Sequence, residues 1–373
     1  MQRFFAKLTV FLTPFLVGFG FPAFVLVASR ESLSADEIAR LHFDGPLDAL
    51  YGAAYTNPDA RYKLVGIELR KPDLVTIGSS RVLEFESGLF VDGSRRFYNG
   101  GLLIERLYEI RRAMRHFDGR HPKYVLLGID QWSFNAAWPS AVDNPLYERE
   151  ISAGVSDLLN AIQRTARFAW PDLIHGKLSM ASLIGGAPHL GVNARTRGNG
   201  FRWDGSMVYA DRLRDPNGER DFDFRESFSR IAEGRRRFEF GSDVDEAALK
   251  ELELLLREAR ERGLEVVAYL PPFAPSVERR LRATGKHSYV DKISPVITPI
   301  FARHGFKVFD FTSCESVGCT DEEFLDGFHA GTKADARMLA AMADQVPWLD
   351  GMVDQELLTQ RIERTPPGPG LSP

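Results

Sequence analysis

The feature that most constrains the fold is an alternation of short apolar runs with amphipathic stretches between residues 73 and 345. Several runs are apolar on both faces, which is typical of strands in a buried parallel sheet. The five runs comprise residues 73–77 (DLVTI), 96–98 (RFY), 124–129 (YVLLGI), 265–270 (EVVAYL) and 307–311 (KVFDF). The alternation predicts an α/β fold, a three-layer αβα sandwich around a mostly parallel five-stranded sheet, with ligands at the carboxyl ends of the strands.

Three amphipathic stretches are expected to form helices that cover this sheet. The first has an apolar stripe at steps of four and three, formed by Leu103, Leu107, Ile110, Met114 and Phe117. The second begins near Ser242 and stops at Gly263, a residue type that commonly follows the last turn of a helix. The third covers residues 333–345.

Composition excludes several classes of protein. The chain has 373 residues, of which 26% are charged, and a formal net charge of -4. This balance, without a dominant basic block, argues against nucleic acid as a partner. Two cysteines are too few for a disulfide-rich scaffold or a zinc ribbon. The length indicates about two domains or one enlarged domain.

An uncharged run near the N-terminus predicts a membrane anchor. Residues 8–29 are 22 uncharged residues, which as one helix would span roughly 33 Å, enough to cross a bilayer core. Arg3 and Lys7 precede the run and favour a cytoplasmic N-terminus, so that the rest of the chain lies in the periplasm or extracellular space. The alternative is a cleaved signal peptide, whose apolar region is normally shorter.

The two cysteines are also consistent with a periplasmic or extracellular location. Cys314 and Cys319 have four residues between them in a loop after a predicted strand, close enough to form a disulfide if the loop turns. Such a bond is expected in an oxidising compartment. The spacing is not that of a redox CxxC motif, and no second cysteine pair exists to complete a metal site.

The predicted organisation has four parts. Residues 1–30 are the anchor, 31–69 a membrane-proximal segment, 70–350 the α/β domain and 351–373 a tail. Within the domain, residues 131–241 break the alternation and are interpreted as an insertion beside the site, with one helical stretch over 151–168. The Pro/Gly-rich end of the tail is expected to be disordered.

Two short motifs contain residues suited to nucleophilic catalysis. The first predicted strand ends in Gly78-Ser79-Ser80, where an α/β sheet can present a nucleophile and a glycine permits a sharp turn. Far along the chain, Asp326 precedes His329 by three residues, so one turn can direct the carboxylate toward Nδ1 of the ring. The Nε2 atom is then free to take a serine proton.

In this order the two motifs resemble those of the SGNH (GDSL-type) hydrolase superfamily. The resemblance implies that Ser80 is the nucleophile, Asp326 the residue that orients the histidine and His329 the base, whereas Ser79 is the weaker candidate. Asn99-Gly100-Gly101 is similar to the superfamily's second block, which implies an oxyanion hole from the Ser80 and Gly100 amides, with Asn99 as the alternative if the register differs by one. No metal or organic cofactor is implied.

One block departs from the superfamily pattern. Asp130 stands where the superfamily has an asparagine that donates to the oxyanion, and an ionised carboxylate would repel that charge. Asp130 is therefore expected to be protonated, to point elsewhere or to do something different. Arg81 and Asp130 are the candidate substrate-binding residues, although Arg81 could instead form a structural ion pair with Asp130 or Glu84.

Within the superfamily, the chain resembles the branch that contains the D-alanyl transfer protein of teichoic acid synthesis and the alginate O-acetylation proteins. The shared features are the GSS start, the FYNGG block, the missing asparagine, Pro271-Pro272 after a late strand and the N-terminal anchor. This implies a serine acyltransferase or esterase acting on O-acyl groups of a cell-envelope or secreted glycan. Its partners would be an acyl donor, a glycan acceptor and a multi-spanning membrane O-acyltransferase.

Two other functions remain open. The first is a non-catalytic scaffold with the SGNH fold that binds a glycan or a membrane acyltransferase, which the departure at Asp130 favours. The second is a solute-binding or sensor domain on an anchor. Loss of acyl-ester hydrolysis in a folded Ser80→Ala variant would distinguish an enzyme from either.

Overall fold

The computed structural model describes residues 1–56, 59–103, 106–117, 120–138, 155–185, 188–210, 221 and 223–365. The predicted disordered end of the tail, residues 366–373, lies outside them. The chain divides into two compact units. Unit 1 comprises residues 1–65, 145–203 and 207–211, and unit 2 comprises residues 66–144, 204–206 and 212–373.

Unit 2 contains the predicted sheet, and all five apolar runs form its strands. The strands are β1 (Leu74–Gly78), β2 (Phe97–Gly101), β3 (Tyr124–Gly128), β6 (Glu265–Leu270) and β7 (Lys307–Asp310). Their order is β2-β1-β3-β6-β7, and every pair is parallel. Ile77 of the central β1 pairs with Gly100 on one side and Leu127 on the other. The predicted mixed α/β class with a parallel five-stranded sheet is confirmed.

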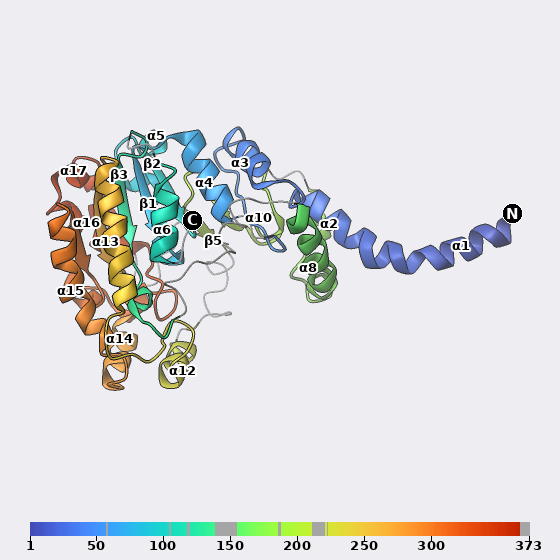
Figure 1. Cartoon of the computed structure of the whole chain (residues 1–373). Helices are drawn as coiled ribbons and strands as arrows, with labels where there is room; N and C mark the ends of the chain where they lie inside the picture. Colours follow the sequence, from blue (N-terminus) through green and yellow to red (C-terminus); the bar gives the residue numbers. More distant parts are fainter. Residues whose placement is uncertain are drawn as a thin grey trace. The chain divides into compact units, whose positions relative to one another are not determined.

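The helices of unit 2 also follow the sequence pattern. The three predicted helices are α6 (Leu107–Met114), α13 (Glu246–Glu261) and α16 (Thr332–Ala343), and α6 and α13 lie side by side (Figure 1). Gly263 follows α13 in the left-handed region, at φ 71°, as expected for a residue that ends a helix. The other α-helices described in this unit are α5 (Gly93–Arg96), α12 (Arg225–Glu233), α14 (Pro275–Ala283), α15 (Tyr289–Arg303), α17 (Pro347–Asp350) and α18 (Gln355–Arg364).

Unit 1 joins segments that the sequence analysis assigned to different parts. Residues of the predicted membrane-proximal segment and of the predicted insertion form one compact unit. Tyr51, for example, pairs with Phe201 through backbone hydrogen bonds of 3.0 and 2.7 Å. The elements are α3 (Ala35–Phe43), α8 (Val155–Ile174), α9 (Met180–Ile184), α10 (Val192–Arg197), β4 (Asn199–Phe201) and β5 (Met207–Tyr209), and α4 (Asp59–Arg70) continues into unit 2. The predicted boundaries of the insertion, 131 and 241, therefore differ from those of unit 1.

The N-terminal apolar run is not one straight helix. It forms α1 (Gln2–Phe15), a π-helical turn η1 (Leu16–Gly20) and α2 (Phe21–Ser29). Among the described residues, no single helix is long and apolar enough to cross a bilayer, although Arg3–Pro14 and Val17–Ser29, bent by 41°, meet the length and composition together. Prolines and π-turns are the usual causes of such a bend, and Pro14 lies next to this one. The expectation of one continuous spanning helix is corrected accordingly.

Candidate active site

Ser80 follows directly after the central strand of the sheet. β1 ends at Gly78, and Ser80 begins a short 3₁₀ turn, η2 (Ser80–Val82). A Cβ atom on Gly78 would lie 2.5 Å from Cγ1 of Val82 and 3.1 Å from the Gly128 carbonyl oxygen. Close packing between β1, β3 and the turn, and not a left-handed turn, is therefore the reason for a glycine here.

A chain of hydrogen bonds joins Ser80, His329 and Asp326. The Oγ atom of Ser80 lies 2.7 Å from Nε2 of His329, and Nδ1 of His329 lies 2.8 Å from Oδ2 of Asp326. The second carboxylate oxygen, Oδ1, accepts the backbone amides of Phe328 at 3.0 Å and His329 at 2.9 Å. The three predicted residues are thus brought together, with each atom facing the partner that proton transfer would need.

The environment of Asp326 favours its charged form. Burial alone would raise the pKa of this carboxyl. The adjacent His329 ring and the hydrogen bonds from His329 and the two amides oppose that effect, so the pKa of Asp326 is held well below its usual value. An ionised Asp326 orients the ring with a proton on Nδ1, which leaves Nε2 as an acceptor.

Arg81 joins the loops that surround the site. Its side chain is buried, and its Nε donates to the Phe328 carbonyl oxygen at 2.8 Å, next to His329. Its Nη1 donates to Oε1 of Gln131 at 2.8 Å and to Oδ1 of Asp130 at 3.2 Å, and its Nη2 donates to the Pro272 carbonyl oxygen. Of the two roles predicted for Arg81, the structure contains the ion pair with Asp130.

Asp130 points toward Arg81. The carboxyl is buried, and burial raises its pKa, although the Arg81 guanidinium, the Ser79 hydroxyl and the more distant Arg237 partly lower it. Of the three outcomes expected for Asp130, the structure favours a side chain that points elsewhere, into a buried ion pair.

Two of the residues predicted to donate to an oxyanion, Asn99 and Gly100, lie in β2, where their N–H groups can already have acceptors within the fold. Both donor groups of Asn99 are used, because its backbone amide donates to the Asp204 carbonyl oxygen at 2.7 Å and its Nδ2 donates to the carbonyl oxygens of Val82 and Phe85 at 2.7 and 2.8 Å. Asn99 thus holds the turn after Ser80, and the oxyanion role stays a prediction that these bonds do not favour. Gly100 lies inside β2, paired with Ile77, where amides belong to the strand ladder.

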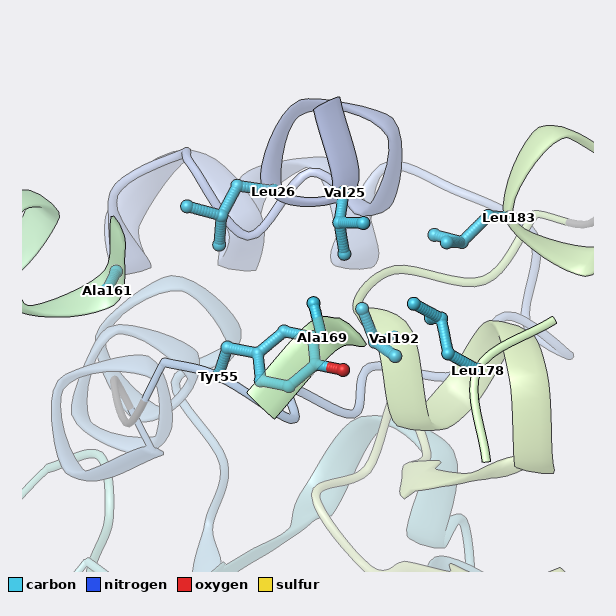
Figure 2. Close-up of a cluster of buried hydrophobic side chains, with 8 residues drawn as sticks. All are labelled: Val25, Leu26, Tyr55, Ala161, Ala169, Leu178, Leu183 and Val192. Carbon is cyan, nitrogen blue, oxygen red and sulfur yellow. The ribbon is translucent and has the colours of Figure 1, made fainter. Parts of the chain in front are cut away.

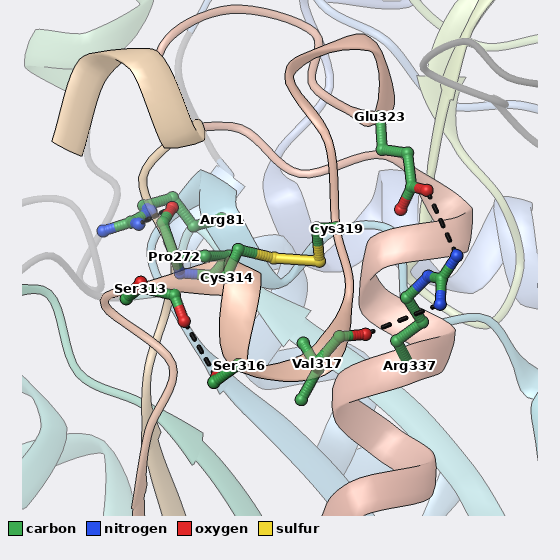
Figure 3. The surroundings of a disulfide bond; sticks show 9 residues. All are labelled: Arg81, Pro272, Ser313, Cys314, Ser316, Val317, Cys319, Glu323 and Arg337. Atoms are coloured by element: carbon green, nitrogen blue, oxygen red, sulfur yellow. Dashed lines mark hydrogen bonds and ion pairs between the residues drawn. A yellow bond between two sulfur atoms is a disulfide. The ribbon is translucent and has the colours of Figure 1, made fainter. Parts of the chain in front are cut away.

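The two cysteines form a disulfide in the loop that follows β7. Cys314 and Cys319 are five positions apart, and both are buried. Figure 3 shows the disulfide with Pro272, which accepts from Arg81, and with Arg337, whose Nη1 and Nη2 lie 3.5 Å from the Val317 carbonyl oxygen and 3.4 Å from Oε1 of Glu323. The bond thus closes a loop between β7 and the segment that carries Asp326 and His329.

Several buried polar residues near the site were not found from the sequence. Gln131 accepts from Arg81 and donates through Nε2 to the Pro271 carbonyl oxygen at 2.6 Å and to Oγ1 of Thr312 at 3.0 Å. Gln131 directly follows Asp130, three residues after the end of β3, and this position was the feature of the sequence that could have indicated its role. Asp335 on α16 is also buried, and neither of its carboxyl oxygens has a hydrogen-bond partner within the part of the chain that the structure describes. A position inside a predicted helix gives no local signal for such a role.

The geometry thus places a serine hydroxyl next to a histidine ring that is hydrogen-bonded to a buried carboxylate. Comparison of the chain with protein-family models, with curated proteins and with solved structures finds no match.

Proposed function

We propose that the chain is a membrane-anchored serine acyltransferase or esterase of the SGNH type, acting outside the cytoplasm on O-acyl groups of a cell-envelope or secreted glycan. The observation that carries the proposal is the hydrogen-bonded chain from Ser80 through His329 to Asp326 at the end of β1. The parallel sheet and its helices are compatible with the three-layer arrangement of that superfamily. The glycan, the acyl donor and a membrane acyltransferase partner belong to the proposal through the sequence resemblance alone.

The proposed reaction has two half-reactions. Nε2 of His329 takes the proton of Ser80 as Oγ attacks the carbonyl carbon of an ester or thioester donor, and the tetrahedral intermediate collapses as His329 protonates the departing alcohol or thiol. An acceptor hydroxyl then loses its proton to His329 and attacks the acyl-Ser80 ester, and Ser80 recovers the proton as it leaves. With water as the acceptor, the same steps make the protein an esterase.

Among the groups predicted for the oxyanion hole, we retain the Ser80 amide. It lies at the start of η2, beside the hydroxyl that would attack. The donors of Asn99 are used elsewhere, and Gly100 lies within the strand ladder. Since each donor to the oxyanion contributes about 10²–10³-fold to turnover, we expect slow hydrolysis of simple esters.

The experiment is hydrolysis of p-nitrophenyl acetate by the full-length oxidised chain. Ser80→Ala and His329→Ala should each lose turnover while circular dichroism stays that of the wild type. Ser79→Ala is the matched control: it removes a neighbouring hydroxyl that accepts the Arg81 amide at 3.3 Å, outside the proposed proton path. Turnover that survives in a folded Ser80→Ala variant would exclude Ser80 as the nucleophile.

The second candidate is a non-catalytic scaffold that binds a glycan or a membrane acyltransferase. The observation in its favour is that Asp130 replaces the superfamily's asparagine and is used in an ion pair. A folded wild type that shows neither hydrolysis nor covalent labelling of Ser80 by a fluorophosphonate would support this candidate.

A further inference from the structure

The C-terminal half of the apolar N-terminal run is part of the core of unit 1. Val25 and Leu26 of α2 are 0% and 2% exposed and pack in one cluster with Ala161 and Ala169 of α8 (Figure 2). Ala161, Thr165 and Ala169 recur at steps of four, so they lie on one face of α8, and all three are buried. α2 is therefore held against a protein helix along one side.

The end of α2 is fixed by a buried carboxylate. Glu31, two residues after the helix, is 2% exposed. Its carboxylate accepts the backbone amides of Ala54 at 2.9 Å, Tyr55 at 2.9 Å, Thr56 at 3.1 Å and Val192 at 2.7 Å. These four bonds tie the apolar run to two further segments of unit 1, residues 54–56 and Val192.

A tryptophan of α8 contacts the bend in the apolar run. The ring of Trp170 lies 4.2 Å from that of Phe21, and its Nε1 donates to the Val17 carbonyl oxygen in η1 at 3.2 Å. Tryptophan is the residue type that membrane proteins concentrate at the lipid–water interface, where its ring is apolar and its N–H finds a polar partner. The apolar run and α8 thus meet at a position suited to a membrane boundary.

The segment of α8 and α9 exposes apolar and basic side chains together. Phe168 is 42% exposed and Ile174 78%, and Ile184 of α9 is 68% exposed. Arg164, Arg167 and Lys177 of the same segment are also exposed. At 100° per residue, Arg167 and Ile174 lie opposite the buried face of α8, Phe168 lies at the edge of that face next to Ala161, and Arg164 lies between Phe168 and Arg167. Among the residues from 160 to 184 whose burial is described, the exposed charged side chains are cations, and the half-buried Asp172 accepts from the Tyr55 hydroxyl at 2.9 Å. Large apolar side chains interspersed with long basic ones suit the interface of an anionic bilayer, because arginine and lysine side chains can extend to the lipid phosphates while apolar side chains enter the acyl region.

We infer that α8 and α9 form a second membrane-contacting surface, which lies among the headgroups and upper acyl chains of anionic lipids beside the N-terminal run. Phe168, Ile174 and Ile184 enter the acyl region, and Arg164, Arg167 and Lys177 face the lipid phosphates. The inference rests on the membrane location in the proposed function and is independent of the acyl chemistry. The partner is lipid because this surface continues the apolar run, through the contact of α2 with α8.

The experiment uses a fluorescent probe on the full-length chain. The only two cysteines are in the disulfide, so Phe168→Cys provides a single thiol for an environment-sensitive NBD label without reductant. In vesicles of phosphatidylethanolamine and phosphatidylglycerol, the emission should shift to the blue, be quenched by lipids with a nitroxide near the headgroup, and be several-fold less sensitive to aqueous iodide. The matched control is Val296→Cys on α15, a helical position 38% exposed against 42% for Phe168, which should stay fully sensitive to iodide.

The outcomes separate the inference from the proposal on which it rests. A chain that does not float with vesicles overturns both the membrane location and the inference. A chain that floats, with the Phe168 probe as open to iodide as the control, overturns the inference alone. Protection that rises with the protein-to-lipid ratio would instead indicate a second copy of the chain on this surface and also overturn it. Adding Arg164→Gln and Arg167→Gln, or replacing the anionic lipid by phosphatidylcholine, should restore much of the iodide quenching.

Discussion

The hydroxyl oxygen of Ser80 lies 2.7 Å from Nε2 of His329, although 249 positions separate the two residues in the chain. The contact depends on the fold, because Ser80 is placed by the end of β1 and His329 by the loop before α16. Arg81 connects the two loops through its bond to the Phe328 carbonyl oxygen.

Asp326→Asn should remove most activity without unfolding the protein. An asparagine amide would face Nδ1 of His329 and favour the ring tautomer with a proton on Nε2, which cannot accept the Ser80 proton. We expect a loss of about 10³–10⁴-fold in kcat for p-nitrophenyl acetate at pH 7. A variant with near wild-type kcat would show that Asp326 does not orient the base.

The contribution of Asp326 to the stability of the fold depends on pH in a defined direction. Its pKa is lowered in the folded state, so its contribution to stability is present above the pKa of the unfolded chain and is lost as the pH falls below it. The stabilising contribution of Asp326 should therefore stay constant between about pH 8 and pH 5. Chemical denaturation of the wild type and of Asp326→Asn over this range would check the expectation, because the difference between their free energies of unfolding should then stay constant.

Arg81→Met should destabilise unit 2 strongly, because it leaves Asp130 buried without its cation. A cost of about 3–5 kcal/mol in the free energy of unfolding is expected for breaking a buried pair from one side. Asp130→Asn should cost less, since the Arg81 guanidinium keeps its bonds to Gln131 and to the carbonyl oxygens of Phe328 and Pro272.

A double-mutant cycle tests the pairing directly. Arg81→Met combined with Asp130→Asn should cost less than the sum of the two single variants, because neither partner is then left unpaired. Urea unfolding of the four proteins provides the measurement. Strict additivity would indicate that the 3.2 Å contact contributes no coupling.

Much of the sheet could be predicted from the sequence because each strand is buried and therefore continuously apolar. The predicted run 265–270 has the bounds of β6, whereas the predicted run 96–98 ended too early. β2 continues through Asn99, Gly100 and Gly101. Glycine has low strand propensity, so these residues give no local strand signal, and only their pairing with β1 holds them in the sheet.

The division into units could not be predicted from local patterns. Tyr51 pairs with Leu190 and Phe201, contacts that span about 140 and 150 positions and depend on backbone groups rather than on a motif. In contrast, Ser80, Asp326 and His329 were identified because the spacing of the last two fits within one turn. Asp130 was singled out by the resemblance alone, and the partner of Arg81 could not be chosen between Asp130 and Glu84 without the packing around Arg81.

Glu31→Gln should destabilise unit 1. The four amides that converge on the carboxylate need an acceptor, and a glutamine places an NH₂ group against some of them. Hydrogen bonds to a charged group contribute about 1.5–3 kcal/mol, so we expect a loss of about 2 kcal/mol or more. Hydrogen exchange of the Ala54, Tyr55 and Val192 amides would measure it. Glu37→Gln, an exposed glutamate of the α3 capping box, is the control and should have a smaller effect.

Asp335→Asn should make unit 2 more stable at neutral pH. Burial, together with the nearby Glu84 carboxyl, raises the pKa of Asp335 well above its usual value, and the Arg81 guanidinium only partly opposes this. In the folded protein the group therefore retains its proton at pH values where the unfolded chain has lost it. Because the folded state then binds more protons, the free energy of unfolding falls as the pH rises above the unfolded pKa, by up to about 1.4 kcal/mol per pH unit.

An isosteric asparagine cannot ionise, so this pH-dependent penalty should disappear. Urea unfolding of the wild type and of Asp335→Asn should give similar stability near pH 4, and the variant should become increasingly more stable than the wild type as the pH rises to 7. Asp344→Asn, a substitution at the end of the same helix, provides the control for a general effect of charge on α16. Parallel stability curves for wild type and Asp335→Asn would mean that the carboxyl is ionised in the folded protein, with a partner that compensates for its burial.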